Sequence, residues 1–132
     1  MAYGVGIVLA LFTVLVARLV GFDRDRAFYP TILVVIASYY VLFAVMGGST
    51  RALIVESIVM TVFLAVAVVG FKFNVWLVVA ALAAHGVFDL VHGRIVTNPG
   101  VPPWWPPFCL AYDVGIALVL VWLLRRPTAR FG

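Results

Sequence analysis

The sequence predicts an all-α fold: an integral membrane bundle of five transmembrane helices that forms a single domain over residues 1–132. Three observations lead to this prediction. Apolar residues make up 66% of the chain and charged residues 11%, whereas charged residues make up about a quarter of an ordinary soluble domain. The apolar residues form five runs, each close to the roughly 20 residues that a helix needs to cross a bilayer. Backbone hydrogen bonds at that depth must be satisfied within the element itself, which favours helices.

The first span is expected at about residues 3–20 and the second at about 29–46. The first lacks a basic leading segment and a cleavage site of small residues, so we expect a retained span rather than a removed signal peptide. Between the two spans lies the mixed-charge run Asp-Arg-Asp-Arg at 23–26, which is typical of a solvated turn. Pro30 falls in the first turn of the second span, where proline is tolerated.

The remaining spans are expected at about 51–70, 75–92 and 108–124. A short turn separates the third and fourth spans, and a proline-rich loop at 98–107 separates the fourth and fifth. Trp104 and Trp105 in this loop are expected to anchor at the membrane interface, as amphipathic aromatic residues commonly do. The alternative is that the loop gates access for a substrate.

The distribution of basic residues predicts the orientation of the bundle. With five spans, seven basic residues fall on one side: Arg18, Arg24, Arg26, Lys72, Arg125, Arg126 and Arg130. The other side has two, Arg51 and Arg94. We therefore expect the N-terminus and the loop at 98–107 outside and the C-terminus in the cytoplasm. Because the net charge of +4 comes from helix ends, we expect no nucleic-acid partner.

Five ionisable residues lie inside the predicted spans: Glu56, His85, Asp89, His92 and Asp113. A carboxylate at the bilayer centre costs about 2.5–3.5 kcal/mol, so such residues usually have partners and a function. At about 1.5 Å per residue all five fall between the middle of the membrane and its outer surface. The sequence therefore predicts a buried polar site in the outer half of the bilayer.

Three further residues share this depth. Cys109 and Tyr112 lie in the same layer of the fifth span, and Tyr40 of the second span can approach it. Two pairs of small residues, Ala80 with Ala84 and Ala111 with Gly115, have the spacing that lets neighbouring helices approach closely. We therefore expect tight helix packing around the polar layer.

Helical spacing limits the metal chemistry of the site. His85, Asp89 and His92 project within a stripe of roughly 60°, so either histidine can chelate an ion together with Asp89. Glu56 or Asp113 would complete the ligand set, and this mixture of imidazole and carboxylate suits zinc or non-haem iron or manganese. Alternatively, Asp89 orients a ligating histidine. The histidines lie about 10.5 Å apart along the axis, which argues against one shared metal. Both lie on one face of the same helix, which argues against a bis-histidine haem within one subunit.

Three kinds of function fit these residues. The first is a metal-dependent enzyme acting on a lipid-soluble substrate, with Glu56, His92 or Asp113 as general acid or base. The second is a transporter or channel component for protons, metal ions or a small solute, although the inner half of the bundle has few polar residues. The third is a structural membrane partner whose polar residues only join helices, at about 0.6 kcal/mol each. Expected partners are membrane lipid and a second copy of the chain.

Two segments carry a resemblance, HGVFDLVHG at 85–93 and VPPWWPPFCLAYD at 101–113. Together they resemble small uncharacterised bacterial multi-pass membrane proteins with a His-x-x-x-Asp-x-x-His helix, a Val-Pro-x-Trp loop and a Cys-x-x-x-Asp helix. The matching residues are His85, Asp89, His92, Val101, Pro102, Trp105, Cys109 and Asp113, with Trp105 one residue beyond that loop spacing. The resemblance implies a site at these positions and a bacterial inner membrane, and it implies no reaction. The chain is also similar in its His and Asp content to ceramidase-like intramembrane hydrolases, but it lacks their seven spans and paired-histidine last helix.

Overall fold

A computed structural model describes residues 1–126 and contains five long helices in that range, with no strand among those residues. The helices are α1 (Ala2–Val20), α2 (Phe28–Met46), α3 (Thr50–Lys72), α4 (Trp76–Ile95) and α5 (Trp105–Arg125). Each is long and apolar enough to cross a membrane. The prediction of an all-α bundle of five such helices is thus confirmed. Arg130 and the C-terminus, which entered the predicted orientation, lie outside the described residues.

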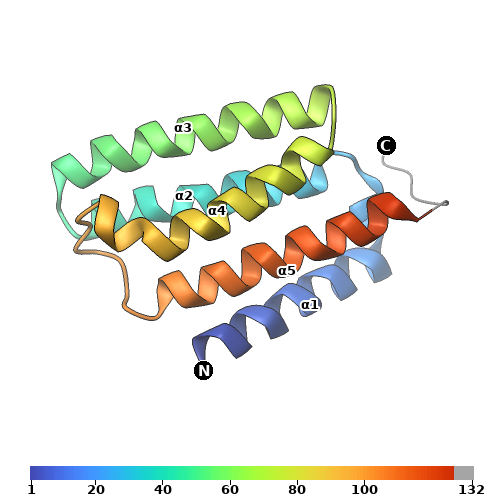
Figure 1. The fold of residues 1–132 in the computed structure, drawn as a ribbon, viewed down its shortest axis with the longest axis horizontal. Coiled ribbons are helices and arrows are strands. Elements are labelled where there is room, and N and C mark those ends of the chain that lie inside the picture. Colours follow the sequence, from blue (N-terminus) through green and yellow to red (C-terminus); the bar gives the residue numbers. More distant parts are fainter. Residues whose placement is uncertain (127–132) are drawn as a thin grey trace.

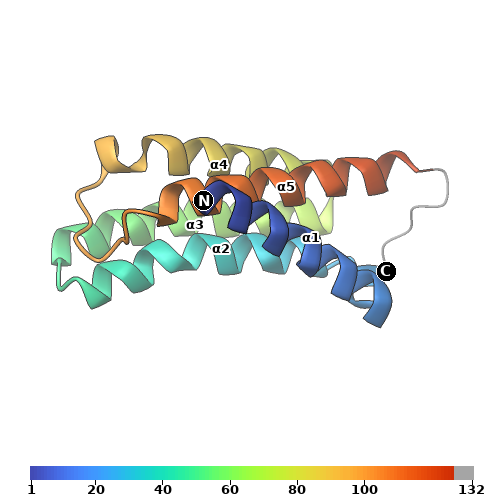
Figure 2. The same cartoon turned by 90° about the horizontal axis from the view of Figure 1, so that it is seen from below.

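The helices run alternately up and down, so successive connections lie at opposite ends of the bundle (Figure 1). The N-terminus, the α2–α3 turn and the α4–α5 loop share one end. The α1–α2 and α3–α4 connections and the end of α5 share the other (Figure 1). α4 packs against α5, α3 and α2, while α1 packs along α5. Seen from below, α4 and α2 run along opposite sides of the bundle (Figure 2).

Small residues set the distance between α1 and α5. A Cβ atom on Gly6 would overlap the carbonyl oxygen of Phe108 and lie 2.9 Å from the Cβ of Ala111. One turn along, a Cβ on Gly115 would lie 3.0 Å from the Cβ of Ala10. The predicted Ala111 and Gly115 pair therefore does permit a close helix contact, and the partner helix is α1.

The prediction that Ala80 and Ala84 let a neighbouring helix approach closely is wrong. Ala80 and Ala84 lie on the exposed face of α4, and Ala81 and Gly86 are buried instead. A Cβ on Gly86 would lie 3.3 Å from side-chain carbons of both Leu110 and Val114, so Gly86 is a small residue that lets α5 pack close to α4.

Helix α5 begins earlier than predicted. Its first residue is Trp105, so Pro106 and Pro107 occupy its first turn, where the missing amide hydrogens have no helical acceptor anyway. The ring of Trp105 is buried against Tyr39 and Phe43, with ring centroids 4.9 and 5.0 Å away, whereas Trp104 is 55% exposed. The prediction that both tryptophans anchor at an interface is therefore wrong for Trp105.

The mixed-charge run also differs from prediction at one residue. Asp23 lies in a short 3-10 helix, η1 (Phe22–Arg24), and its carboxylate is buried beside Arg18 at 3.3 Å. Asp25 is exposed and accepts a hydrogen bond from the Ala27 amide at 2.9 Å. The solvated-turn prediction fits Asp25 and fails for Asp23, because Arg18 on the preceding turn of α1 supplies a partner.

Candidate functional site

The five ionisable residues predicted inside the spans are all buried, with at most 2% of their surfaces exposed. They are Glu56, His85, Asp89, His92 and Asp113. They come from α3, α4 and α5 and form two adjoining groups. We call these the His85 group (His85, Asp89, Cys109 and Asp113) and the Glu56 group (Glu56, His92 and Asn98).

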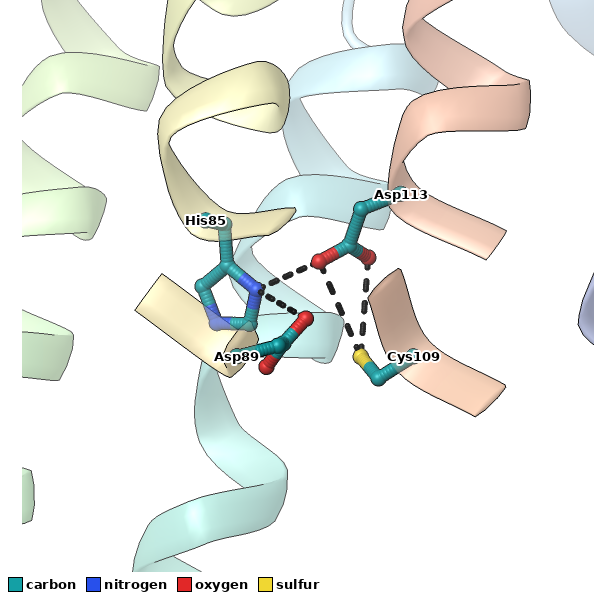
Figure 3. Close-up of side chains that lie close together, drawn as sticks. All are labelled: His85, Asp89, Cys109 and Asp113. Atoms are coloured by element: carbon teal, nitrogen blue, oxygen red, sulfur yellow. Dashed lines mark hydrogen bonds and ion pairs between the residues drawn. The ribbon is translucent and has the colours of Figure 1, made fainter. Parts of the chain in front are cut away.

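The His85 group joins α4 and α5 (Figure 3). Nδ1 of His85 lies 2.6 Å from Oδ2 of Asp113 and 3.5 Å from Oδ2 of Asp89. The thiol of Cys109 donates to Asp113 from the preceding turn of α5, with Sγ 3.5 Å from Oδ1. All four side chains point toward one another, so their donor atoms line one small volume (Figure 3).

This volume has the dimensions of a metal site. One ligand atom from each of the four residues can be chosen so that all lie within 4.8 Å of one another. Donor atoms around a tetrahedral zinc ion lie about 3.3–3.8 Å apart, given bond lengths of roughly 2.0–2.3 Å. The spacing of His85 from Asp89 and that of Cys109 from Asp113, each 3.5 Å, already fall in this range. A metal ion would replace the shorter contact between His85 and Asp113.

One atom of the His85 group is left without a hydrogen bond. Oδ2 of Asp89 is buried and has no hydrogen-bond partner among the described residues. A buried carboxylate oxygen without a donor costs about 1–3 kcal/mol or more because it has lost its hydration. It lies on the side of Asp89 that faces His85 (Figure 3), so a cation bound there would satisfy it.

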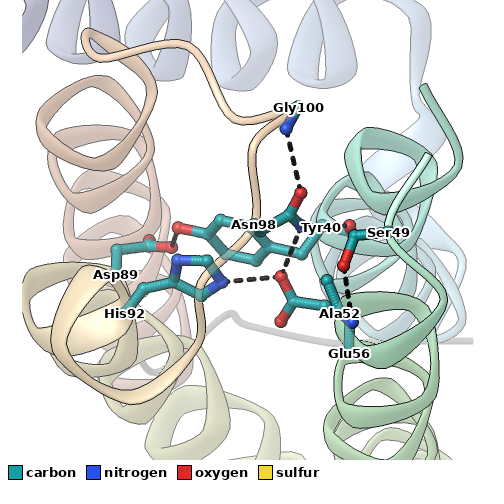
Figure 4. Close-up of polar contacts among 8 residues, drawn as sticks. All are labelled: Tyr40, Ser49, Ala52, Glu56, Asp89, His92, Asn98 and Gly100. Carbon is teal, nitrogen blue, oxygen red and sulfur yellow. Dashed lines mark hydrogen bonds and ion pairs between the residues drawn. The ribbon is translucent and has the colours of Figure 1, made fainter. Parts of the chain in front are cut away.

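The Glu56 group joins α3, α4 and the α4–α5 loop (Figure 4). Nε2 of His92 lies 2.6 Å from Oε2 of Glu56. The Asn98 amide donates to the same oxygen at 2.8 Å and to the backbone carbonyl of Tyr40 at 3.1 Å. The loop can bring Asn98 this close because Gly100 lies directly against the backbone of Phe43, where a Cβ atom would overlap it.

Tyr40 connects the two groups. Its hydroxyl donates to Oδ1 of Asp89 at 2.6 Å (Figure 4). Its ring stacks on the imidazole of His92, with centroids 3.9 Å apart and the planes inclined by 11°. One side chain of α2 therefore fixes the position of a residue in each group.

The structure thus brings three of the predicted metal ligands together, His85, Asp89 and Asp113. It places Glu56 and His92 on the other side of Tyr40, so their roles as ligand, acid or base stay predictions. Sequence reasoning put Cys109 in the right layer but left it out of the ligand set, although its position four residues before Asp113 is a chelating spacing. It missed Asn98, which no helical pattern can place.

A groove opens beside the His85 group. It has a volume of about 320 Å³ and lies between α1, α2 and α5. Cys109 forms part of its wall, so this residue belongs both to the groove and to the polar group.

No protein-family model, curated protein or solved structure matches this chain. The resemblance to small bacterial membrane proteins stays a prediction.

Proposed function

We propose that this membrane protein binds one divalent transition-metal ion, zinc or non-haem iron, and acts as an enzyme on a lipid-soluble substrate. The observation that carries the proposal is the convergence of four buried donor residues, His85, Asp89, Cys109 and Asp113, within 4.8 Å. Such a concentration of ionisable side chains is expensive inside an apolar bundle unless a charge of opposite sign compensates it.

Charge balance supports a divalent cation. Asp89 and Asp113 together supply two negative charges, which a divalent ion neutralises without any further counter-ion. The remaining donors are an imidazole and a thiol. With Cys109 bound as a thiolate, the combination of His, Cys and carboxylate suits zinc and leaves one negative charge beyond the two that the ion neutralises. If Cys109 keeps its proton, one histidine and two carboxylates suit iron or manganese instead.

The residues around the metal have defined tasks in this proposal. A metal ion of this kind would activate a water molecule or polarise a substrate carbonyl. Tyr40 holds Asp89 in position through its hydroxyl group. His92 and Glu56 form the nearest proton-exchanging pair, and the Tyr40 ring fixes their imidazole beside the His85 group.

Metal analysis of the purified protein tests the proposal. We expect close to one zinc or iron ion per chain, lost in His85→Ala and in Asp89→Asn. The second variant keeps the size of the side chain and removes its charge, so it should fold. Asp25→Asn is the matched control, because Asp25 is an exposed carboxylate outside the site. A folded protein free of metal after growth and purification with zinc and iron would contradict the proposal and leave the polar layer as helix-joining hydrogen bonds.

A further inference from the structure

We infer that the groove between α1, α2 and α5 binds one uncharged, single-chain lipid whose head group accepts a hydrogen bond from Trp105. The inference rests on the proposed function, because it assigns the class of substrate that reaches the His85 group. It is carried by the shape of the groove, the chemistry of its wall and its contact with Cys109.

The groove has the shape of a single extended chain. Its α2 wall runs from Phe28 to Tyr39, which is about 17 Å at 1.5 Å per residue. Its volume of about 320 Å³ is near the lower limit of roughly 300–1,000 Å³ for small-molecule pockets. A volume this small over that length fits one chain and leaves no room in the groove for a second. The groove exists because α1 packs along α5 and leaves the facing side of α2 uncovered.

The wall is apolar along most of its length. Ile32, Ile36 and Phe108 line it, and none of the described residues that line it carries a charge. A carboxylate, phosphate or ammonium head group would therefore enter without a partner, at a high desolvation cost. An alcohol, aldehyde or ester avoids that cost.

One polar group in the groove wall is suited to bind a head group. The indole Nε1 of Trp105 is buried and has no hydrogen-bond partner among residues 1–126, and Trp105 lines the groove. A buried N–H without an acceptor costs about 1–3 kcal/mol. A head-group oxygen that reached this enclosed atom would satisfy it, which would place the head of the lipid at the Trp105 end of the groove and its chain along α2.

This end of the groove is also the end that meets the candidate metal site. Cys109 lies one helical turn after Trp105 and lines the same groove. Its Sγ is 3.5 Å from Oδ1 of Asp113. A lipid with its oxygen at Trp105 would thus have the functional group beside the residues proposed to hold the metal, while its chain stays in the apolar part.

Photolabelling of the protein in nanodiscs tests the inference. The probe is a dodecanol with a diazirine near the end of its chain, and peptide mass spectrometry maps the labelled residues. We expect saturable labelling concentrated on residues 28–39. Val35→Trp should reduce it at least about tenfold, because the added ring occupies the groove. Val35 is 47% exposed, so the ring displaces no packed core residue. Leu42→Trp is the control: it is 49% exposed on the same helix and lies outside the groove.

Two further arms test the head group. Trp105→Phe keeps the ring packing and removes the N–H, so half-saturation should need about 2–10 times more probe, the value of one hydrogen bond. Trp104→Phe should leave it unchanged. Unlabelled dodecanol should compete at least about tenfold better than dodecanoate, whose charge has no partner in the groove.

Each result has a definite reading. Labelling spread over all lipid-facing helices, or equal labelling of Val35→Trp and Leu42→Trp, would overturn the inference. Equal competition by dodecanoate would overturn the uncharged head group, and an unchanged Trp105→Phe would overturn its hydrogen bond. Metal content is measured in the same preparations. Groove labelling in a protein that binds no metal would contradict the proposed function and leave this inference standing. A metal-loaded protein without groove labelling would contradict this inference and leave the proposed function standing.

Discussion

Every buried carboxylate of the site takes a partner from another element of the bundle. Asp113 of α5 meets His85 of α4, and Glu56 of α3 meets His92 of α4. Asp89 of α4 accepts from Tyr40 of α2. In Asp89 this contact holds Oδ1, whereas Oδ2 has no hydrogen bond among the described residues and lies 3.5 Å from Nδ1 of His85, a position from which it can bind a metal ion.

Tyr40→Phe tests whether the Tyr40 hydroxyl orients Asp89 for metal binding. The variant keeps the ring that stacks on His92 and removes only the hydroxyl that donates to Asp89. We expect the free energy of unfolding to fall by about 1–3 kcal/mol, because a buried carboxylate oxygen loses its donor. Metal affinity, measured by competition with a chelator, should fall about 10- to 100-fold, as is typical when a residue that orients a ligand is removed. Tyr39→Phe, one residue away on α2, is the control. Equal metal affinity in the two variants would contradict the orienting role.

The residues of the site were predictable to the extent that they lie on helices. Charged side chains inside apolar runs are visible in the sequence, and the helical repeat gives their depth and relative angle. This reasoning located His85, Asp89 and Asp113, which do converge. It does not reach Asn98, since the loop has no repeat and the approach depends on Gly100 lying against α2.

At the scale of helices, α1 contacts the rest of the bundle mainly through α5. It packs along α5 through Gly6 and Ala10, and most of its other side chains are exposed. Its contribution to the site is therefore indirect: it forms one wall of the groove through Leu9.

Gly6→Ala is expected to push α1 away from α5. The added methyl group would overlap the carbonyl oxygen of Phe108, a backbone atom that cannot rotate away. We expect a loss of about 1–3 kcal/mol in the free energy of unfolding, the usual cost of overpacking. Gly4→Ala is the matched control, because a Cβ at Gly4 meets nothing within 4 Å. Both variants gain the same helix propensity, so the difference between their unfolding midpoints isolates the contact. Equal midpoints would show that α1 does not depend on it.

The lengths of the apolar runs predict the five helices. The polar residues of a helix determine which of its faces turns inward. Ala80 and Ala84 have suitable spacing and still lie outside, because His85, Asp89 and His92 direct a different face of α4 to the centre. Ala81, one turn before His85, lies on that inner face. The predicted fifth span begins at residue 108, after the start of α5 at Trp105. Prolines are typical of loops, but they are also compatible with the first turn of a helix.

At the scale of the whole molecule, most basic residues of the described range lie at one end of the bundle. In residues 1–126, six basic residues lie toward the end of the bundle that holds the α1–α2 and α3–α4 connections: Arg18, Arg24, Arg26, Lys72, Arg125 and Arg126. The opposite end has two, Arg51 and Arg94. The Glu56 group lies toward this second end, since Glu56 is in the second turn of α3 and Asn98 is in the α4–α5 loop.

Basic residues stay preferentially in the cytoplasm when a membrane protein inserts, so this distribution predicts a cytoplasmic C-terminus. Green fluorescent protein and alkaline phosphatase fused at Gly132 and inserted after Gly48 test it in bacterial cells. Gly48 suits an insertion because it lies in the α2–α3 turn, with nothing within 4 Å of its Cβ position. We expect fluorescence without phosphatase activity at Gly132 and the reverse at Gly48. The reverse pattern at both positions would place the Glu56 group toward the cytoplasm and require substrate and metal to reach the site from that side.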